Sequence, residues 1–186
     1  MKVDATRLPG VLLIEPKRHG DHRGFFAETY SQQAYAELGV EAAFVQDNHS
    51  LSAAAGTVRG LHFQAPPSAQ AKLVRCGRGA IFDVAVDIQR GSPTYGQWAG
   101  YTLSAENGAQ LYIPAGFAHG FVTLEPDSEI IYKCSDYYAP ETEGALRWDD
   151  LDIGIGWPLS AEAILSEKDA RAPLLADFNS PFTVER

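Results

Sequence analysis

The sequence is poor in sulfur-containing residues and has no long apolar run. Two cysteines and one methionine occur among 186 residues, which excludes a small scaffold held together by several disulfides. Cys76 and Cys134 could pair with each other, but in a cytosolic protein such residues are more often buried free thiols. No stretch approaches the roughly 20 consecutive apolar residues of a transmembrane helix. We therefore expect no disulfide and no membrane-spanning segment.

Positive charge is also scarce. Lys and Arg together number 15 against 24 Asp and Glu, which gives a formal net charge of −9. Nucleic-acid-binding proteins usually carry a basic surface, so we expect no nucleic-acid partner. An acidic protein can still bind a phosphorylated metabolite where its few cations converge. The first ten residues, MKVDATRLPG, lack the apolar core of a secretory signal, and we expect a cytoplasmic protein that does not bind membranes.

The hydrophobic pattern has the period of β-strands. Residues 80–88 alternate apolar side chains with Asp83 and Asp87, which predicts a half-buried strand with both carboxylates on its polar face. Similar runs, separated by turn-forming Gly, Pro and Asn residues, predict further strands over 11–14, 24–30, 43–51, 57–63, 72–76, 98–103, 110–113, 116–124 and 129–135. Many short strands indicate an all-β fold, either an antiparallel sandwich or a closed barrel of the jelly-roll type.

Helices are few and short. Residues 31–38 form the one convincing helical segment in the first part of the chain, where Ser31 can cap the helix and Gly39 can end it. The tail beyond Leu151 is predicted to be irregular with short helical turns, the clearest beginning at Ser166. The length lies within the usual range of one domain. Residues 1–186 are therefore predicted to be a single domain with short peripheral helices.

One histidine lies in a spacing typical of a barrel mouth. Gly108, Pro114, Gly116 and His119 follow the pattern Gly, five residues, Pro, one residue, Gly, two residues, His. This spacing is similar to the second sequence motif of the cupins, a jelly-roll superfamily. Pro114 and Gly116 favour a tight turn, after which His119 would begin a strand and face inward.

The corresponding first motif is incomplete. Gly56 and His62 fit it, but Gln64 replaces a second histidine, and Ala69 stands where a carboxylate is expected. A stable transition-metal site usually needs three or more protein ligands. His62 and His119 alone should not hold a metal, so we expect no metal and no cofactor, and His62 is free for acid–base chemistry.

The whole chain resembles one branch of this superfamily. The similarity lies in motifs that occur in a constant order: Asp21-His-Arg-Gly-Phe-Phe-Ala-Glu28, Gln46-Asp-Asn-His-Ser50, Thr57-Val-Arg-Gly-Leu-His-Phe-Gln64 with Lys72-Leu-Val74, Asp83-Val-Ala-Val-Asp87, Ser92-Pro-Thr-Tyr-Gly-Gln-Trp98, Ile113-Pro-Ala-Gly-Phe-Ala-His-Gly-Phe121, Tyr137-Tyr-Ala-Pro140 and Leu165-Ser-Glu-Lys-Asp169. In these segments the sequence resembles the dTDP-4-dehydrorhamnose 3,5-epimerase family, the metal-free sugar-nucleotide branch of the cupins. The resemblance implies a cupin-like jelly-roll β-barrel.

The resemblance also implies a reaction and four catalytic residues. The family inverts C3 and C5 of a dTDP-linked 4-keto-6-deoxyhexose, whose protons at these carbons are acidic because of the C4 ketone. His62 would be the base, with Asp169 fixing its tautomer. Lys72 would stabilise the enolate oxygen, and Tyr132 would be the general acid. Taken one at a time, each of these residues could equally be an ordinary structural residue of a strand or surface.

Further positions correspond to the substrate-binding residues of the family. The segment that contains Arg23, Phe26 and Glu28 matches a part that the family supplies from a partner subunit, which implies a homodimer with exchange of N-terminal strands. Arg59 would bind the diphosphate, and Tyr138 would stack on thymine or simply pack at an edge. The remaining matches are Gln46, Asp47, Asn48, His119, Glu143 and Lys168. Trp148-Asp-Asp150 departs from the Trp-Asn-Asp that is more common in the family.

Three alternatives stay open at this stage. A sibling enzyme that epimerises only C3 or only C5 would carry the same catalytic residues. A metal-dependent cupin enzyme is disfavoured by the missing ligands. A non-catalytic binder would not need a matched base and acid.

Overall fold

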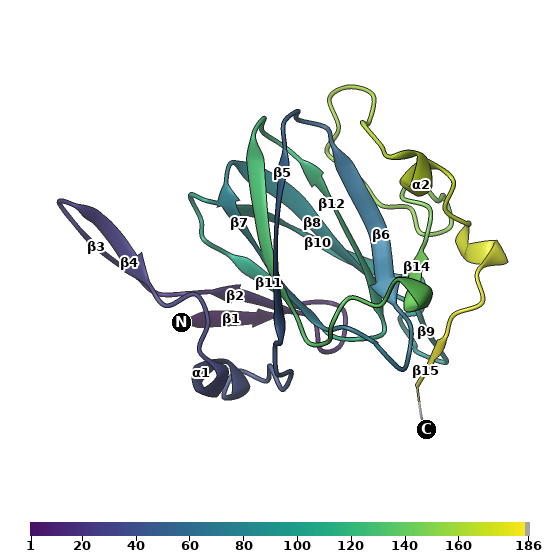
Figure 1. Ribbon diagram of the computed structural model, residues 1–186, viewed down its shortest axis with the longest axis horizontal. Helices are drawn as coiled ribbons and strands as arrows, with labels where there is room; N and C mark the ends of the chain where they lie inside the picture. The colour runs from purple at the N-terminus through teal and green to yellow at the C-terminus, as the bar shows by residue number, and fades with distance from the viewer. Residues whose placement is uncertain (185–186) are drawn as a thin grey trace.

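Two antiparallel β-sheets face each other in the computed structural model, which describes residues 1–184 (Figure 1). The six-stranded sheet has the order β1 (Lys2–Ala5), β2 (Leu12–Glu15), β11 (Gln110–Ile113), β7 (Lys72–Arg78), β13 (Ser128–Cys134) and β5 (Gln46–Ser52). The five-stranded sheet has the order β10 (Trp98–Ser104), β8 (Ala80–Asp87), β12 (Phe117–Thr123), β6 (Val58–Gln64) and β14 (Glu143–Ala145). This arrangement confirms the predicted all-β, cupin-like fold.

The main hydrophobic core lies between the two sheets. Leu111 and Ile130 from the six-stranded sheet pack with Ile81, Ala85 and Phe121 from the five-stranded sheet. Each of these strands contributes alternate residues to the interior, as the period of two predicts. The core fills one end of the space between the sheets and leaves polar side chains at the other.

The prediction of a half-buried β8 is wrong. The face of β8 that carries Val84 and Val86 does not point into the barrel, because these residues pack on Ile153, Trp157 and other side chains of the C-terminal tail. The other face points into the barrel and carries Asp83, which is fully buried. Strand β8 lies inside its sheet and is covered on both faces. Its alternating residues therefore point to two buried regions, the barrel interior and the layer under the C-terminal tail, and neither face points to solvent.

The predicted helices exist and are short. Ser31 caps α1 (Gln32–Ala36) by accepting a hydrogen bond from the Ala34 N–H, and Gly39 has a positive φ of 93° just beyond its end. The tail beyond Leu151 contains α2 (Glu167–Ala170) and the 3₁₀ turn η2 (Leu175–Asp177), and a further 3₁₀ turn, η1 (Pro140–Thr142), precedes it. Cys76 and Cys134 are buried free thiols, as predicted. Among residues 1–184, no helix is long and apolar enough to cross a membrane.

Sequence patterns did not reveal the shortest strands. Strand β1 was missed, as were β14 and the parallel pair of β9 (Gln89–Arg90) and β15 (Phe182–Thr183). The predicted strand over 24–30 is β4 (Gly24–Ala27), which pairs in a hairpin with β3 (Arg18–Asp21), a strand that was not predicted. A strand of two to four residues carries few alternations, so its period is a weak signal, and only some strands of this length, such as β2 and β11, were predicted.

The tail is held along the edge of the five-stranded sheet. Ile164 forms a parallel bridge with Thr57, and its carbonyl accepts a hydrogen bond from the Val58 N–H. This contact places α2 beside β6 (Figure 1). The β3–β4 hairpin lies on the other side of the molecule and projects from it (Figure 1).

Candidate active site

A bulge in β6 turns two residues of this strand toward one cavity. His62 pairs with His119 of β12, but Arg59 pairs with Phe121, so three steps along β6 match two along β12. In a regular strand, residues three apart point to opposite faces. The bulge removes this difference, and Arg59 and His62 both line a cavity of about 480 Å³.

Gly60 is required at this bulge. Its φ is +122°, and a Cβ atom there would lie 2.6 Å from the Gly120 Cα and 2.7 Å from the His119 carbonyl oxygen. Any side chain would therefore collide with the backbone of β12. The glycine allows β6 and β12 to approach closely at the point where their two histidines stand side by side.

His62 and Asp169 form a hydrogen-bonded pair at the cavity wall. Nε2 of His62 lies 2.6 Å from Oδ1 of Asp169, whose side chain is only 5% exposed. Ser166 caps α2 by accepting a hydrogen bond from the Asp169 N–H, which fixes the position of the carboxylate. Burial by itself would raise the pKa of Asp169, but the hydrogen bonds and charge of His62, together with Ser166, hold this pKa below its ordinary value. The carboxylate is therefore ionised and orients the ring.

Lys72 and Tyr132 reach the same cavity from the opposite sheet. Lys72 begins β7, Tyr132 lies on β13, and both line the cavity with His62. Burial lowers the pKa of the Lys72 amine and raises the pKa of the Tyr132 phenol. Nζ of Lys72 lies 3.4 Å from the His62 carbonyl oxygen. The cavity thus has the imidazole of His62 on one wall and the amine of Lys72 and the phenol of Tyr132 on the other.

A second histidine–carboxylate pair lies deeper in the barrel. Nε2 of His119 lies 2.7 Å from Oδ1 of Asp83, and the two side chains are 7% and 0% exposed. Burial lowers the pKa of His119, although Asp83 acts in the opposite direction. Sequence analysis identified His119 but assigned Asp83 to a polar outer face. A carboxylate within a strongly apolar strand was the signal that could have identified it.

A polar network from three segments begins at Lys168, which lines the cavity. Lys168 of α2 forms an ion pair of 2.6 Å with Glu143, which also accepts a hydrogen bond from the Tyr138 hydroxyl. Gln46 accepts a hydrogen bond from the Tyr138 N–H and donates one to Asn48. The structure therefore brings these predicted binding residues together at one end of the barrel.

Three basic residues of this acidic protein converge on the cavity. Arg59, Lys72 and Lys168 all line the cavity. Arg23 does not, because it lies on the projecting hairpin and pairs with Asp21. The converging cations create a local positive potential that suits a phosphorylated ligand.

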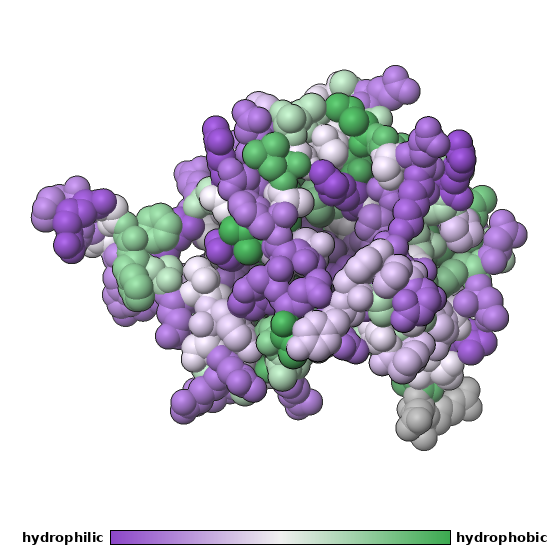
Figure 2. Space-filling model, viewed as in Figure 1, coloured by the Kyte–Doolittle hydropathy of each residue, from purple (hydrophilic) through white to green (hydrophobic). Residues whose placement is uncertain are grey.

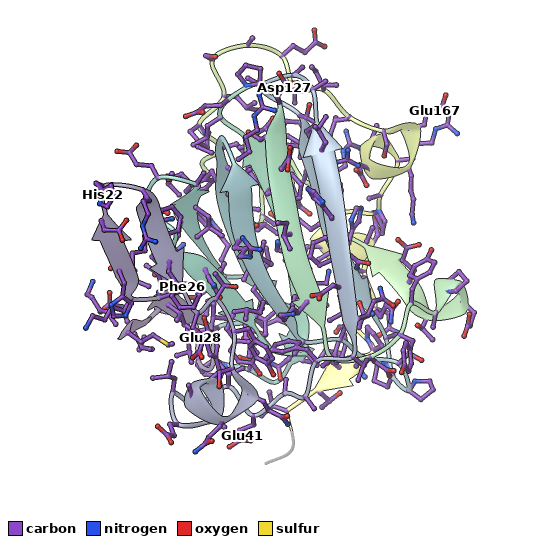
Figure 3. All side chains as sticks on the ribbon, turned by 60° about the vertical axis from the view of Figure 1, so that its left-hand side comes forward. His22, Phe26, Glu28, Glu41, Asp127 and Glu167 are labelled. Atoms are coloured by element: carbon purple, nitrogen blue, oxygen red, sulfur yellow. The ribbon has the colours of Figure 1, made fainter. Side chains whose placement is uncertain are left out.

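Four predicted binding residues lie outside both the cavity lining and this hydrogen-bonded network. Asp47 lies on the outward face of β5 and pairs with Lys133, because its neighbours on either side take the inward positions of the strand. Arg23, Phe26 and Glu28 belong to the β3–β4 hairpin or follow it. Figure 3 shows Phe26 and Glu28 on the side of the molecule opposite Glu167 of α2.

Gln64 is committed to backbone groups. Its amide nitrogen donates to the carbonyls of Ser68 and Tyr137, and its amide oxygen accepts from the Ala139 N–H. The side chain therefore holds the loop that leads to Tyr138. In the part of the chain that the structure describes, no group of three His, Cys, Asp or Glu residues could hold a metal ion.

The arrangement is suited to proton transfer beside a carbonyl group. It combines an oriented imidazole, the buried amine of Lys72 and a phenol that retains its proton, within a cavity large enough for a hexose. The cations at its mouth suit a diphosphate.

Comparison with known proteins points to the same chemistry. The sequence model of the family described as dTDP-4-dehydrorhamnose 3,5-epimerase matches residues 5–177. A dTDP-4-dehydrorhamnose 3,5-epimerase from Salmonella typhimurium is 57% identical over 176 residues, which cover 94% of this chain and 96% of the relative.

Solved structures are also similar. The dTDP-6-deoxy-D-glucose-3,5-epimerase of Legionella pneumophila, crystallised in complex with dTDP-4-keto-L-rhamnose, superposes with a TM-score of 0.92 at 47% identity and covers 96% of this chain and 94% of its own. The 3'-monoepimerase ChmJ of Streptomyces bikiniensis, in complex with dTDP-quinovose, superposes with a TM-score of 0.86 at 37% identity and covers 92% of this chain and 86% of its own.

Proposed function

Because the chain belongs to the dTDP-4-dehydrorhamnose 3,5-epimerase family, we propose that it inverts C3 and C5 of dTDP-4-dehydro-6-deoxy-D-glucose to form dTDP-4-dehydro-L-rhamnose. One observation carries this proposal for the residues of this chain. The His62–Asp169 pair faces the same cavity as Lys72 and Tyr132, which come from the opposite sheet.

His62 is the proposed base. Asp169 engages Nε2, so Nδ1 is the nitrogen left to accept a proton from the substrate. Removal of the proton from C3 or C5 sends the electron pair of the broken C–H bond into the C4 carbonyl group, which becomes an enolate. Lys72 stabilises the enolate oxygen, a contribution on the order of 10²–10³ in rate for one well-placed donor.

Tyr132 is the proposed acid. Inversion requires that the new proton reach the carbon from the face opposite the base. His62 and Tyr132 belong to opposite sheets, which supports a substrate bound between them. Burial raises the pKa of Tyr132, so the phenol keeps its proton at neutral pH and can donate it when the enolate collapses. Exchange with solvent then restores both side chains.

The nucleotide is proposed to bind at the cavity mouth. Arg59 and Lys168 suit the two phosphates, and Tyr138, which is 59% exposed, suits the face of the thymine base. Gln46, Asn48, Glu143 and His119 complete the proposed binding set. Asp47 is not included, because its side chain faces away from the cavity and pairs with Lys133.

We also propose that the enzyme is a homodimer in which each β3–β4 hairpin serves the partner's cavity. Phe25 and Phe26 are 61% and 71% exposed, and Figure 2 shows hydrophobic residues on the surface of this projection, between its hydrophilic tip and the main body. Large exposed apolar side chains on a projecting element are typical of an interaction surface. The exchange would bring Arg23, Phe26 and Glu28 to the substrate.

Sedimentation tests the assembly. The parent protein is expected to sediment as a dimer, and Phe26→Asp is expected to yield a folded monomer with little activity. A parent protein that sediments as a monomer at its working concentration and retains full activity would contradict the exchange.

Deuterium uptake tests the reaction. In D₂O, the parent protein should convert dTDP-4-dehydro-6-deoxy-D-glucose to a product that carries deuterium at both C3 and C5, as read by NMR. His62→Ala should abolish uptake. His49→Ala is the matched control, because His49 lies on the outward face of β5 and pairs with Glu129. Equal uptake by His62→Ala and the parent would refute the proposed base.

A second candidate is inversion of C3 alone. The similarity to the 3'-monoepimerase ChmJ favours it, and deuterium at C3 without inversion of C5 would identify it. Turnover that is lost on treatment with EDTA would instead favour a metal-dependent cupin enzyme.

A further inference from the structure

Asp83 is a buried carboxylate with only one of its oxygens engaged. Its side chain is 0% exposed in the barrel interior, and Oδ1 lies 2.7 Å from Nε2 of His119. Among residues 1–184, no group donates a hydrogen bond to Oδ2. Leaving a buried acceptor without a partner costs stability, and such groups in native structures call for an explanation. Among these residues, His119 is the hydrogen-bond partner of the Asp83 side chain.

The hydrogen bond determines the tautomer of His119. An ionised carboxylate can only accept, so Nε2 carries the ring proton and donates it to Asp83. Nδ1 is then the unprotonated nitrogen of the neutral ring. No protein group bonds to it among the described residues, and His119 lines the cavity, so Nδ1 is the nitrogen available to a ligand there.

Neighbouring groups keep this ring neutral. Burial lowers the pKa of His119, and the nearby Lys72 and His62 lower it further, against the opposing effect of Asp83. A neutral ring in this tautomer offers a lone pair to the cavity and no proton. The two groups beside His62 therefore have opposite hydrogen-bonding roles toward a ligand, because Lys72 donates hydrogen bonds and His119 accepts them.

From this geometry we propose that Asp83 is a positioning residue, which fixes His119 as a hydrogen-bond acceptor for a sugar hydroxyl and prevents it from binding the ketone oxygen. The proposal rests on the proposed function. A 4-keto-6-deoxyhexose linked through C1 has free hydroxyls only at C2 and C3, and its ketone can only accept. An acceptor at His119 therefore binds one of these hydroxyls, and the ketone is left to Lys72. The sugar is oriented without any bond being made or broken by Asp83.

The tautomer can be measured without substrate. In full-length protein labelled with ¹⁵N-histidine, the spectrum of His119 at neutral pH should show a protonated Nε2 and an unprotonated Nδ1. Asp83→Asn should populate the other tautomer, because an amide can donate to Nε2. A proton on Nδ1 of the parent ring, or on both nitrogens, would overturn the proposal even if no variant folds.

Substrate analogues test the consequence. For dTDP-4-dehydro-6-deoxy-D-glucose, Asp83→Asn should lower kcat/KM for deuterium uptake at C5 by about 10- to 100-fold, as expected for the loss of a hydrogen bond to a buried group. This penalty should disappear with one of the two analogues that lack the C2 or the C3 hydroxyl, and the analogue that removes it identifies the hydroxyl bound. An equal penalty with both analogues would overturn the proposal.

Asp87→Asn is the matched control. Asp87 is a second buried carboxylate on β8, but it accepts hydrogen bonds from Ser92 and Thr94 in a loop away from the cavity. Folded Asp87→Asn should keep the kcat/KM of the parent with dTDP-4-dehydro-6-deoxy-D-glucose and with both analogues. A fall in kcat/KM like that of Asp83→Asn would show that the loss is structural only and would overturn the proposal. Failure of the parent protein to epimerise would reject the proposed function and leave the tautomer measurement intact.

Discussion

Replacement of Asp169 by asparagine removes the carboxylate that orients His62. The bond between them is 2.6 Å long, and the Asp169 side chain is 5% exposed, so the interaction is charge-assisted and shielded from water. An amide of the same size can donate to Nε2 and shift the ring proton to Nδ1. The nitrogen proposed to accept the substrate proton would then be occupied.

The expected loss of activity is much larger than the loss of stability. We expect kcat to fall by roughly 10²–10⁴, the range that general-base catalysis contributes. The free energy of unfolding should fall by about 1–3 kcal/mol, because one buried hydrogen bond to a charged group is weakened. The backbone N–H of residue 169 keeps its bond to Ser166, so α2 retains its cap. A domain stable by about 5–15 kcal/mol stays folded after this change.

Two measurements on the same samples separate these effects. NMR in D₂O gives the rate of deuterium uptake at C3 and C5, and urea denaturation gives the free energy of unfolding. Glu167→Gln is the control, because Glu167 lies on the same helix, is 87% exposed and pairs with Arg171. Parent-like uptake by folded Asp169→Asn, or an equal loss in Glu167→Gln, would refute the role assigned to Asp169.

Three further predictions concern pH and packing. Burial lowers the pKa of Lys72, so its ammonium group loses a proton at a lower pH than that of an ordinary lysine. Lys72→Arg should therefore move the alkaline limb of the profile of kcat against pH to higher pH. An unmoved limb would contradict this prediction. The pKa of Asp169 lies below 3.8 in the folded protein, so its stabilising contribution is complete above this pH and is lost as the pH falls through the folded value. The difference in unfolding free energy between the parent and Asp169→Asn should therefore be constant near neutral pH and shrink only in urea titrations below about pH 4. Gly60→Ala should lower the free energy of unfolding by about 3 kcal/mol more than Gly24→Ala does, as measured by urea denaturation. The two glycines have similar positive φ angles (+122° and +128°), but only at Gly60 would an added Cβ meet the backbone of Gly120. Equal losses in the two variants would argue against a clash at the bulge.

The sequence by itself determined the class of fold and most of the candidate site. Short alternating runs can bury their apolar faces only by forming sheets, so the period of two was sufficient to predict an all-β fold, and the family resemblance narrowed it to a cupin-like jelly roll. The cap of α1 at Ser31 was also predictable, because capping depends on neighbours along the chain. His62, Lys72 and Tyr132 were identified because each lies in a short sequence segment that resembles the family.

Only the tertiary structure decided which faces and segments meet. An alternating pattern distinguishes two faces of β8 but cannot show that the C-terminal tail covers one of them, and so the inward position of Asp83 was missed. The bulge at Gly60 places Arg59 and His62 on one side, against their spacing. Asp169 meets His62 across 107 residues because the tail is held against β6. Each of these outcomes depends on contacts between distant segments, which the local periodicity of a chain does not encode.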